Sequence, residues 1–366
     1  MKKELLKIIK CTCGKNDFNI FEKKTLGGEI RDGYIECKIC QNRYDIKNGI
    51  LNLLLKPRDE IISEVKSRDT EIMDMFLKDD VRRKLFEDFI LSLPKPPESL
   101  KQKMQQKIID DFPPDLQKLI ISRDTSIYFQ FYAPNFEYIL NKMNLTGGER
   151  ILDIGAGNCW TTRYFARKGC NCTALDIFSI KYLGLETSDI YFRADNIYFE
   201  RVLGDMENLP FMDESFDIIF ANAALHHSSQ LDIVFKNILR LLSKRGKIVL
   251  VNEPAVGYLR RKTLEEHQRM GRDIGRNENI YTISDWMRIM KNNKLNAQYF
   301  FPPTIIEVLD KGEIIPGQAP IYLQKMAFYI WKIDLIKKLI INHLYFPIQF
   351  LVGIGIVMIA EKEFEN

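Results

Sequence analysis

The chain has 366 residues, of which 46% are hydrophobic and 28% are charged, and its formal net charge at pH 7 is +4. The length excludes one small domain and predicts two or three structural units, with a composition that is ordinary for a soluble globular protein. So small a net charge gives no reason to expect a nucleic-acid partner, although a local basic patch is compatible with it.

The N-terminal segment, residues 1–56, contains four of the seven cysteines. They form two short pairs, Cys11 with Cys13 and Cys37 with Cys40. The opening MKKELLKIIK has no apolar signal core, so we expect a cytoplasmic protein with reduced thiols. Two thiolate pairs on β-hairpins can hold one zinc ion, which would stabilise a unit with few core residues. The sequence therefore predicts a zinc-ribbon-like domain.

Residues 57–135 are charged, helical in pattern and interrupted by prolines. We expect them to form a helical linker or lid, and no catalytic motif is visible in them.

From residue 136 onward, apolar strands alternate with helices. The expected strands are ERILDIG (149–155), CTALDI (172–177), RVLGD (201–205), FDIIFAN (216–222) and KIVLVNEP (247–254). This alternation predicts an α/β domain with a doubly wound parallel sheet over 136–366. Its core would span 136–254, followed by a helical insertion and final strands in 255–366.

One apolar run near the end has no charge for seventeen residues, from Leu344 to Ala360. Its length is at the lower limit for a membrane helix, but Pro347, Gly353 and Gly355 interrupt it. We therefore expect a loop followed by a buried strand over 352–360, and no stable membrane insertion. A membrane role is the alternative.

The first strand of this domain runs into a glycine turn, ILDIGAGNCW, with Gly155 and Gly157. Glycines let the backbone approach a ligand closely, although a plain tight turn has the same pattern. Trp160 stands where a dinucleotide fingerprint has its third glycine, and no G-K-[ST] follows, which excludes a P-loop. Asp153 would also repel a pyrophosphate. A dinucleotide is disfavoured.

Acidic residues end three successive strands: Asp153, Asp176 and Asp205. A carboxylate at the Asp176 position can accept hydrogen bonds from ribose hydroxyls, and one at the Asp205 position from an adenine amine. Each acid alone also fits a helix cap or a loop. Together, at adjacent strand ends, they indicate an adenosine-containing ligand.

These motifs resemble those of class I S-adenosylmethionine-dependent methyltransferases. The resemblance covers 136–254 and is carried by ILDIGAGNCW, ALDIF, GDMENLPFMDESFDIIFANAALHH and LRLLSKRGKIVLVNEP. It implies a Rossmann-like fold and S-adenosylmethionine as cofactor. By position, it implies that Asp153, Gly155 and Gly157 meet the methionine part, Asp176 the ribose, Asp205 the adenine amine, Met206 the adenine edge and Asn222 the transferred methyl.

A general base is needed only if the methyl acceptor is protonated, because the sulfonium already carries a reactive methyl group. His226, His227 and Glu253 are the candidates near the fourth and fifth strands. The alternative is that the histidine pair packs and caps the start of a helix.

The methyl acceptor is the least defined part of the predicted function. The segment after the fourth strand reads ANAALHH, without the N-P-P-Y-like run of enzymes that methylate DNA amino groups and without a cysteine nucleophile. Relatives with the L-P-F-x-D-x-S-F-D motif act mostly on small molecules, including lipid-linked and sugar acceptors. The resemblance therefore implies a small-molecule acceptor.

The N-terminal segment leaves two alternatives open. ECKICQNRYDIKNGILNLL resembles zinc-ribbon activators of tRNA and protein methyltransferases, although Cys11-Thr12-Cys13 departs from their C-P-x-C pair. Ribosomal RNA methyltransferases also carry such a ribbon, so an RNA acceptor is one alternative. A non-catalytic scaffold is the other.

A basic cluster lies in the insertion: Arg260, Arg261, Lys262, Arg269, Arg272 and Arg276, with Tyr258, Tyr281 and Trp286 among them. If these residues line the site, they favour an anionic acceptor, since arginine pairs with phosphate. The alternative is a solvated helix face. We expect the helices of 57–135 and 255–295 to cover the strand ends; the oligomeric state stays open.

Overall fold

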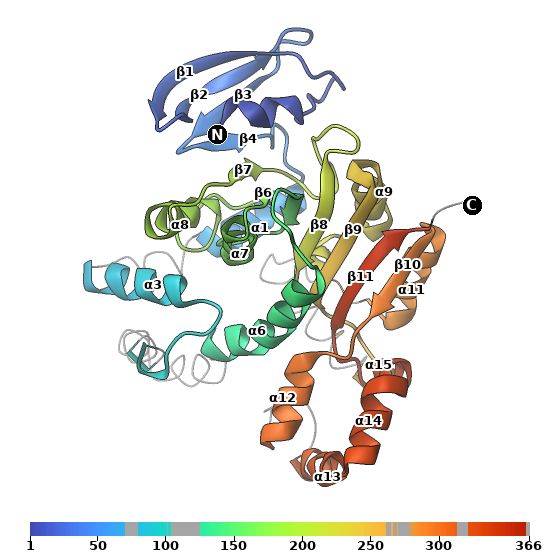
Figure 1. Cartoon of the computed structure of the whole chain (residues 1–366). Helices are drawn as coiled ribbons and strands as arrows, with labels where there is room; N and C mark the ends of the chain where they lie inside the picture. The colour runs from blue at the N-terminus through green and yellow to red at the C-terminus, as the bar shows by residue number, and fades with distance from the viewer. Residues whose placement is uncertain are drawn as a thin grey trace.

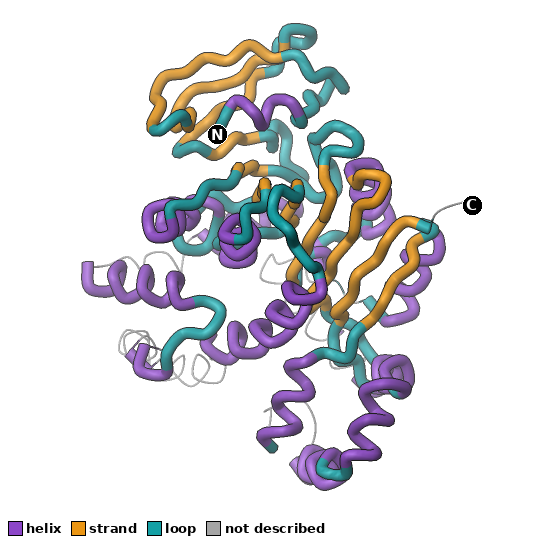
Figure 2. The backbone as a smooth tube through the Cα atoms, in the orientation of Figure 1, coloured by secondary structure: helices purple, strands orange, loops and turns teal. Residues whose placement is uncertain are grey.

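The computed structural model of the chain describes residues 1–69, 80–100, 102–103, 125–260, 265, 269, 279, 281–312 and 321–363. Within these ranges the strands form one eleven-stranded sheet in the order β1-β2-β3-β4-β7-β6-β5-β8-β9-β11-β10 (Figure 1). Helices cover both faces of its central part (Figure 2).

The centre of the sheet is parallel and confirms the doubly wound prediction. Its strands are β5 (Arg150–Ile154), β6 (Asn171–Asp176), β7 (Glu200–Leu203), β8 (Phe216–Asn222) and β9 (Leu242–Glu253). β5 pairs in parallel with both β6 and β8, so the chain order reverses on either side of β5. Such a switch point opens a crevice at the carboxyl ends of the strands.

The N-terminal strands extend this same sheet, which the sequence did not predict. They are β1 (Phe18–Leu26), β2 (Glu29–Cys37), β3 (Arg43–Lys47) and β4 (Ile50–Asn52), preceded by the 3-10 helix η1 (Lys3–Lys7). β4 is antiparallel to β3 but parallel to β7, with Leu51 opposite Val202. The carboxyl end of β4 therefore lies at the same edge as those of the parallel strands. The expected domain boundary at residue 56 stays a prediction.

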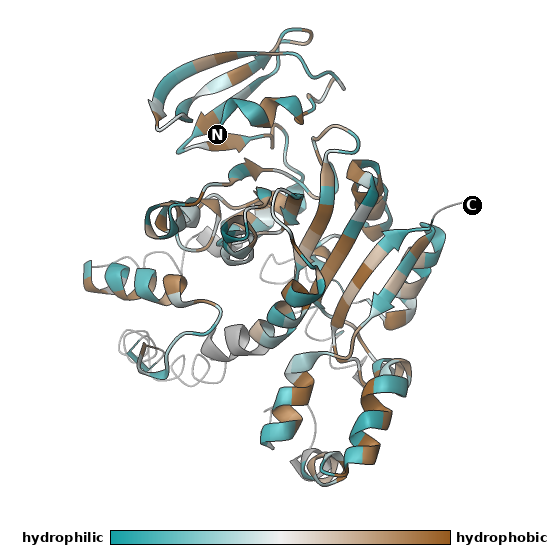
Figure 3. Cartoon of the chain, in the orientation of Figure 1, coloured by the Kyte–Doolittle hydropathy of each residue, from teal (hydrophilic) through white to brown (hydrophobic). Residues whose placement is uncertain are grey.

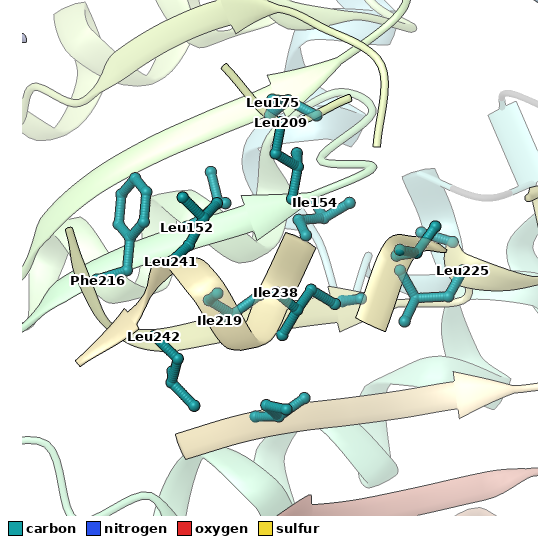
Figure 4. Close-up of a cluster of buried hydrophobic side chains, with 14 of the residues drawn as sticks. Leu152, Ile154, Leu175, Leu209, Phe216, Ile219, Leu225, Ile238, Leu241 and Leu242 are labelled. Carbon is teal, nitrogen blue, oxygen red and sulfur yellow. The ribbon is translucent and has the colours of Figure 1, made fainter. Parts of the chain in front are cut away.

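Side chains alternate between two cores, one on each face of the sheet. On β9, Ile248 and Leu250 face one core while Val249 and Val251 face the other, as the two-residue period of a strand requires. The first core is covered by α9 (Leu231–Leu241) and α11 (Ile283–Asn292); in Figure 4, Ile238 and Leu241 of α9 lie beside Leu152 and Ile154 of β5. The second is covered by α3 (Asp80–Ser92), α6 (Thr125–Lys142), α7 (Trp160–Arg167) and α8 (Ser188–Asp195).

Shorter helices lie in the connections between these elements. They are α1 (Asp59–Asp69), η2 (Leu185–Thr187), η3 (Leu225–His227) and η4 (Tyr258–Arg260).

Beyond α11, the described residues add two strands and four helices. β10 (Leu295–Tyr299) and β11 (Ile356–Lys362) pair antiparallel, and β11 pairs antiparallel with β9. The strand expected over 352–360 is confirmed but begins at Ile356, because Gly353 and Gly355 before it have positive φ angles of 69° and 80°. The helices, which lie beyond the end of the sheet in Figure 1, are α12 (Pro303–Lys311), α13 (Ile321–Trp331), α14 (Asp334–His343) and α15 (Tyr345–Leu351).

The apolar run that ends in β11 was expected to begin with a loop, and that part of the prediction is wrong. Residues Tyr345–Leu351 form α15, with Pro347 in its first turn, where a missing backbone N–H costs nothing. Across the described residues, no helix combines the length and apolar character needed to cross a bilayer.

A buried ionic cluster joins the N-terminal strands to the parallel sheet. Arg201 on β7 is fully buried and pairs with Glu29 on β2 and with Asp189 on α8, the latter at 2.8 Å. Arg31 on β2 donates two hydrogen bonds to Asp189, at 2.9 and 2.7 Å. Arg201 and Glu29 are buried, whereas Arg31 and Asp189 are partly exposed, so the two buried charges depend on their partners for solvation.

Candidate active site

The crevice at the switch point is a cavity of about 630 Å³. Its floor is formed by the segments that follow four parallel strands, and its cover comes from α1 and α6. The lining residues include 155–158, 175–178, 204–206, 222–224 and 226–228, with Arg58, Glu60, Ile61, Glu64 and Tyr132 on the covering side.

The glycine turn after β5 requires glycine for two reasons. Gly155 and Gly157 have φ angles of 70° and 51°, in the region that other residues seldom adopt. A Cβ on Gly155 would also collide with the side chain of Ala224. The turn is held to β6, because the Gly155 N–H donates to the Leu175 carbonyl at 2.9 Å.

Asp176 lies in the cavity wall at the end of β6, as expected for a ligand of ribose. Its Oδ2 accepts the Gly157 N–H at 2.7 Å and its Oδ1 accepts the Phe178 N–H at 2.9 Å. These two bonds fix the carboxylate in place. A carboxylate oxygen has more than one acceptor position, so both can still accept from a ligand.

Asp153 has a different setting from the one the motif implied. Its side chain is 1% exposed and does not line the cavity. Its Oδ2 accepts the hydroxyls of Thr161 and Thr162 at 2.7 and 2.6 Å. Burial raises the pKa of Asp153 to about 7, although the two hydroxyl bonds counteract it. Asp153 thus anchors the first turn of α7 beneath the glycine turn, and its contact with a ligand stays a prediction.

Asp205 lies in the cavity wall beside Met206, but it is paired with an arginine that sequence reasoning missed. Arg58, just before α1, donates from Nε and Nη2 to the two Asp205 oxygens at 2.9 and 3.2 Å. The same guanidinium contacts Glu207 at 2.7 Å. Arg58 is 147 residues from Asp205 in sequence, and no local pattern marks such a pair.

Asn222 ends a chain of three amide side chains whose direction is fixed. The Thr304 backbone N–H donates to Asn135 Oδ1 at 2.9 Å, and Asn135 Nδ2 donates to Asn252 Oδ1 at 2.7 Å. Asn252 Nδ2 in turn donates to Asn222 Oδ1 at 2.7 Å. Since a backbone N–H can only donate, every amide in the chain has one orientation. The Asn222 oxygen is engaged within the protein, so Asn222 offers its NH₂ group to the cavity that it lines.

The three candidate bases occupy unequal positions. Glu253 is fully buried and accepts three backbone N–H groups of residues 224–226 and a ring nitrogen of His226 at 3.1 Å. Burial would raise the pKa of Glu253, but these hydrogen bonds outweigh it and lower the pKa. His227 lines the cavity, with its Nδ1 at 3.6 Å from Glu64 Oε1 on α1. Both histidines line the cavity, but His226 is hydrogen-bonded to the buried Glu253, whereas His227 lies beside Glu64.

The basic cluster of the insertion lies mostly outside the described residues. This holds for Arg261, Lys262, Arg272 and Arg276, and for the side chain of Arg260; Arg269 is exposed.

Of the three aromatic residues that accompany the basic cluster, two have structural roles. Trp286 is fully buried in the core against α9 and does not line the cavity. Tyr281 donates its hydroxyl to the Ser228 carbonyl at 2.7 Å, next to the cavity, whereas Tyr258 is 79% exposed.

The four N-terminal cysteines converge, although 29 residues separate the outermost two. Their sulfur atoms all lie within 4.8 Å of one another, with Cys11 to Cys40 at 3.4 Å and Cys13 to Cys37 at 3.6 Å. Zinc–sulfur bonds of about 2.3 Å in a tetrahedron place sulfurs about 3.8 Å apart. The donor set and spacing therefore fit one zinc ion. The Tyr44 hydroxyl lies 3.1 Å from Cys11 Sγ and supports that side of the cluster.

Comparison with known proteins identifies the class of the central domain. Residues 152–250 match the family model described as "Methyltransferase domain". Malonyl-[acyl-carrier protein] O-methyltransferase from Erwinia billingiae is 30% identical over 105 residues, which are 28% of this chain and 38% of that protein. Demethylmenaquinone methyltransferase from Tropheryma whipplei is 34% identical over 108 residues, 30% of this chain and 43% of that protein.

Among solved structures, YcgJ from Bacillus subtilis is similar with a TM-score of 0.42 and 20% identity, over 63% of this chain and 99% of that one. Residues 152–250 thus match a methyltransferase domain, and the parallel strands around them have a Rossmann-like order. It spans less than half the length of the two curated relatives named above.

Proposed function

We propose that the protein transfers a methyl group from S-adenosylmethionine to a small molecule. The observation that carries this proposal is the cavity at the switch point, in which Gly155, Gly157, Asp176 and Asp205 line one wall. All four belong to the segment that matches the methyltransferase domain. S-adenosylmethionine would supply the activated methyl group, and the protein would bind and align it with the acceptor.

In this proposal, different residues of the cavity bind different parts of the cofactor. Asp176 is suited to the two ribose hydroxyls, and Asp205 to the amino group of adenine. Arg58 holds Asp205 in this structure, so cofactor binding would require the guanidinium to turn towards Glu207, its other partner. The NH₂ group of Asn222 is suited to an oxygen on the methionine part or on the acceptor. The predicted roles of Gly155, Gly157 and Met206 are backbone contacts at the turn and adenine edge.

A small-molecule acceptor is supported by the relative whose name specifies demethylmenaquinone, whereas the other named relative acts on a malonyl group carried by a protein. The charged residues of the described cavity wall bear on the charge of the acceptor group. Glu60 and Glu64 add negative charge near His227, while the positive charge of Arg58 is balanced by Asp205 and Glu207. This balance favours a neutral or cationic acceptor group over the anionic one that the basic cluster suggested.

A labelled-methyl assay on a cell extract tests the acceptor class. The extract is split into small-molecule and RNA fractions, and each is incubated with the protein and methyl-labelled S-adenosylmethionine. We expect label in the small-molecule fraction. Label in RNA alone would establish the RNA alternative, and its binding would weaken steeply with salt. No transfer to either fraction, despite cofactor binding, would favour the scaffold.

His227 is the residue best placed to accept a proton from the acceptor, with Glu64 as its positioning carboxylate. We expect His227→Gln to lower kcat about 10²- to 10⁴-fold, the usual contribution of a general base. Glu64→Gln should lower kcat less than His227→Gln does, because Glu64 only positions the imidazole. Affinity for S-adenosylhomocysteine serves as the control and should change little in both variants. A His227→Gln variant with the wild-type kcat would remove His227 as the base.

The four cysteines would hold a structural zinc ion. We expect about one zinc per chain in protein purified without added metal, because four thiolates form a closed tetrahedral site. Cys37→Ser should lose the zinc and unfold at a lower temperature. Cys170→Ser is the matched control, since its Sγ donates to Glu149 outside the cluster and a hydroxyl can do the same. Equal zinc content and stability in the two variants would disprove the zinc site.

A further inference from the structure

The C-terminal helices present large apolar side chains to solvent. Nine of the nineteen large hydrophobic residues that are exposed in the described part of the chain fall within 326–351. They are Met326, Tyr329, Ile330, Ile333, Leu335, Leu339, Phe346, Phe350 and Leu351, and their exposed fractions run from 41% to 78%. Scattered exposed leucines are normal in a soluble protein, but so dense a group in one segment marks an interaction surface.

These residues follow the helical repeat. On α13, Met326, Tyr329 and Ile330 are spaced by three and four residues, so they share one side of the helix. Leu335 and Leu339 on α14 are spaced by four. Figure 3 shows apolar segments on α14, beyond the end of the sheet. The exposed stripes therefore belong to ordered faces of the helices.

On α15 the usual arrangement of polar and apolar sides is reversed. Gln349 is fully buried and its amide is bonded to the Tyr345 hydroxyl at 3.0 Å and to the Ile354 N–H at 2.8 Å. Phe346 and Phe350, spaced by four, face outward at 42% and 60% exposure. Water alone would favour the opposite orientation. An apolar medium outside α15 would account for it.

The charges around these stripes have mainly one sign. In residues 325–351 the lysines are Lys325, Lys332, Lys337 and Lys338, and the single acidic residue is Asp334. Lys325, Lys332 and Lys338 are exposed, while Lys337 is bonded to Asp310 on α12. Exposed lysines beside apolar and aromatic side chains complement a surface that is anionic at its rim and apolar beneath.

We propose that α13, α14 and α15 form a docking face for an anionic lipid bilayer. The helices are 11, 10 and 7 residues long, too short to span a membrane, so they would lie in its interface. The apolar stripes enter the boundary between headgroups and acyl chains, and each lysine near the surface adds attraction to anionic headgroups. Charge complementarity favours this partner over a second copy of the chain, whose own face is also basic.

Vesicle flotation with the full-length protein tests this face. The probes are vesicles of phosphatidylcholine alone and of phosphatidylcholine with phosphatidylglycerol, and we expect binding only to the second kind, weakened by salt. Leu335→Ser combined with Phe350→Ser should reduce that binding at least about tenfold, since two large apolar contacts are lost. Changing Lys325, Lys332 and Lys338 to glutamine should reduce it similarly.

The control pair is Leu26→Ser with Phe21→Ser, which removes two exposed apolar side chains, 69% and 41% exposed, from β1. This pair should bind vesicles like the wild type. Equal binding of all variants, or no binding by the wild type, would overturn the proposal. So would a concentration-dependent dimer in sedimentation that the Leu335/Phe350 variant abolishes, because the face would then join two copies. Cofactor affinity is measured alongside and should be unchanged, so failure here is distinct from failure of methyl transfer.

Discussion

Asp176→Ala should lower the affinity for S-adenosylhomocysteine at least about 100-fold. Asp176 is the carboxylate at the end of β6 that lines the cavity, and two hydrogen bonds from ribose to a charged acceptor contribute about 1.5 to 3 kcal/mol each. Isothermal titration with S-adenosylhomocysteine measures the change directly.

The matched control for this prediction is Asp213→Asn. Asp213 is an exposed carboxylate that pairs with Arg240 on the surface, away from the cavity, so its removal should leave the affinity unchanged. Asp176→Asn separates ligand contact from loop structure, because it keeps one acceptor for the N–H groups of Gly157 and Phe178. Wild-type affinity in both Asp176 variants would mean that the ribose is bound elsewhere.

Arg201→Met should destabilise the folded protein by up to about 3 to 5 kcal/mol, the cost of removing one partner from a buried ionic cluster. Arg201 is fully buried between Glu29 and Asp189, and its loss would leave Arg31 as the one guanidinium that the structure shows paired with both carboxylates. Urea unfolding measures the difference. Arg43→Met is the control, since Arg43 and Asp45 form an exposed pair whose loss should cost at most about 1 kcal/mol.

The ionic cluster around Arg201 should also make the stability of the folded protein depend on pH. Burial would raise the pKa of Asp189, but the bonds from Arg31 and the charge of Arg201 outweigh it and lower the pKa. A lowered folded-state pKa stabilises the protein above the ordinary aspartate pKa of about 3.9, and this contribution is lost as the pH falls towards the folded-state value. The stability difference between wild type and Arg201→Met should therefore narrow below about pH 4. A stability difference that widens below this pH would contradict the lowered pKa of Asp189.

The parallel sheet could be predicted from the sequence because its signals are local. Each of its strands is an apolar run bounded by a turn, and the cofactor acids stand at the ends of those runs. β4 could not be predicted in the same way: it has three residues, and its partner β7 begins about 150 residues later, at Glu200. Its pairing depends on tertiary structure, not on a local pattern.

The candidate site shows the same division between local and distant signals. The position of Asp176 follows from the strand that it ends. The roles of Glu253 and Asp153 do not, since each is determined by donors that the fold brings to it, from residues 224–226 and from α7. Trp286 was considered for the site only together with the basic cluster. It lies in the core instead, where Ile283, Trp286 and Met290 are spaced as one buried helix face.

The N-terminal unit and the cavity are connected through the covering segment. After β4 the Leu53 N–H donates to the Leu203 carbonyl at 2.9 Å, and the chain then reaches Arg58 and α1 over the cavity. Residues 57–135 were expected to form a linker or lid. Arg58, Ile61 and Glu64 lie in the cavity wall, but 70–79, 101 and 104–124 lie outside the described residues, so the linker or lid stays a prediction.

A crystal structure of the protein with S-adenosylhomocysteine tests the central proposal most directly. We predict the ligand in the cavity over the Gly155–Gly157 turn, with its ribose on Asp176 and its adenine beside Asp205 and Met206. The Arg58 guanidinium should have left the Asp205 carboxylate. An empty cavity at saturating ligand, or ligand bound away from Asp176, would contradict the assignment of this cavity to the cofactor.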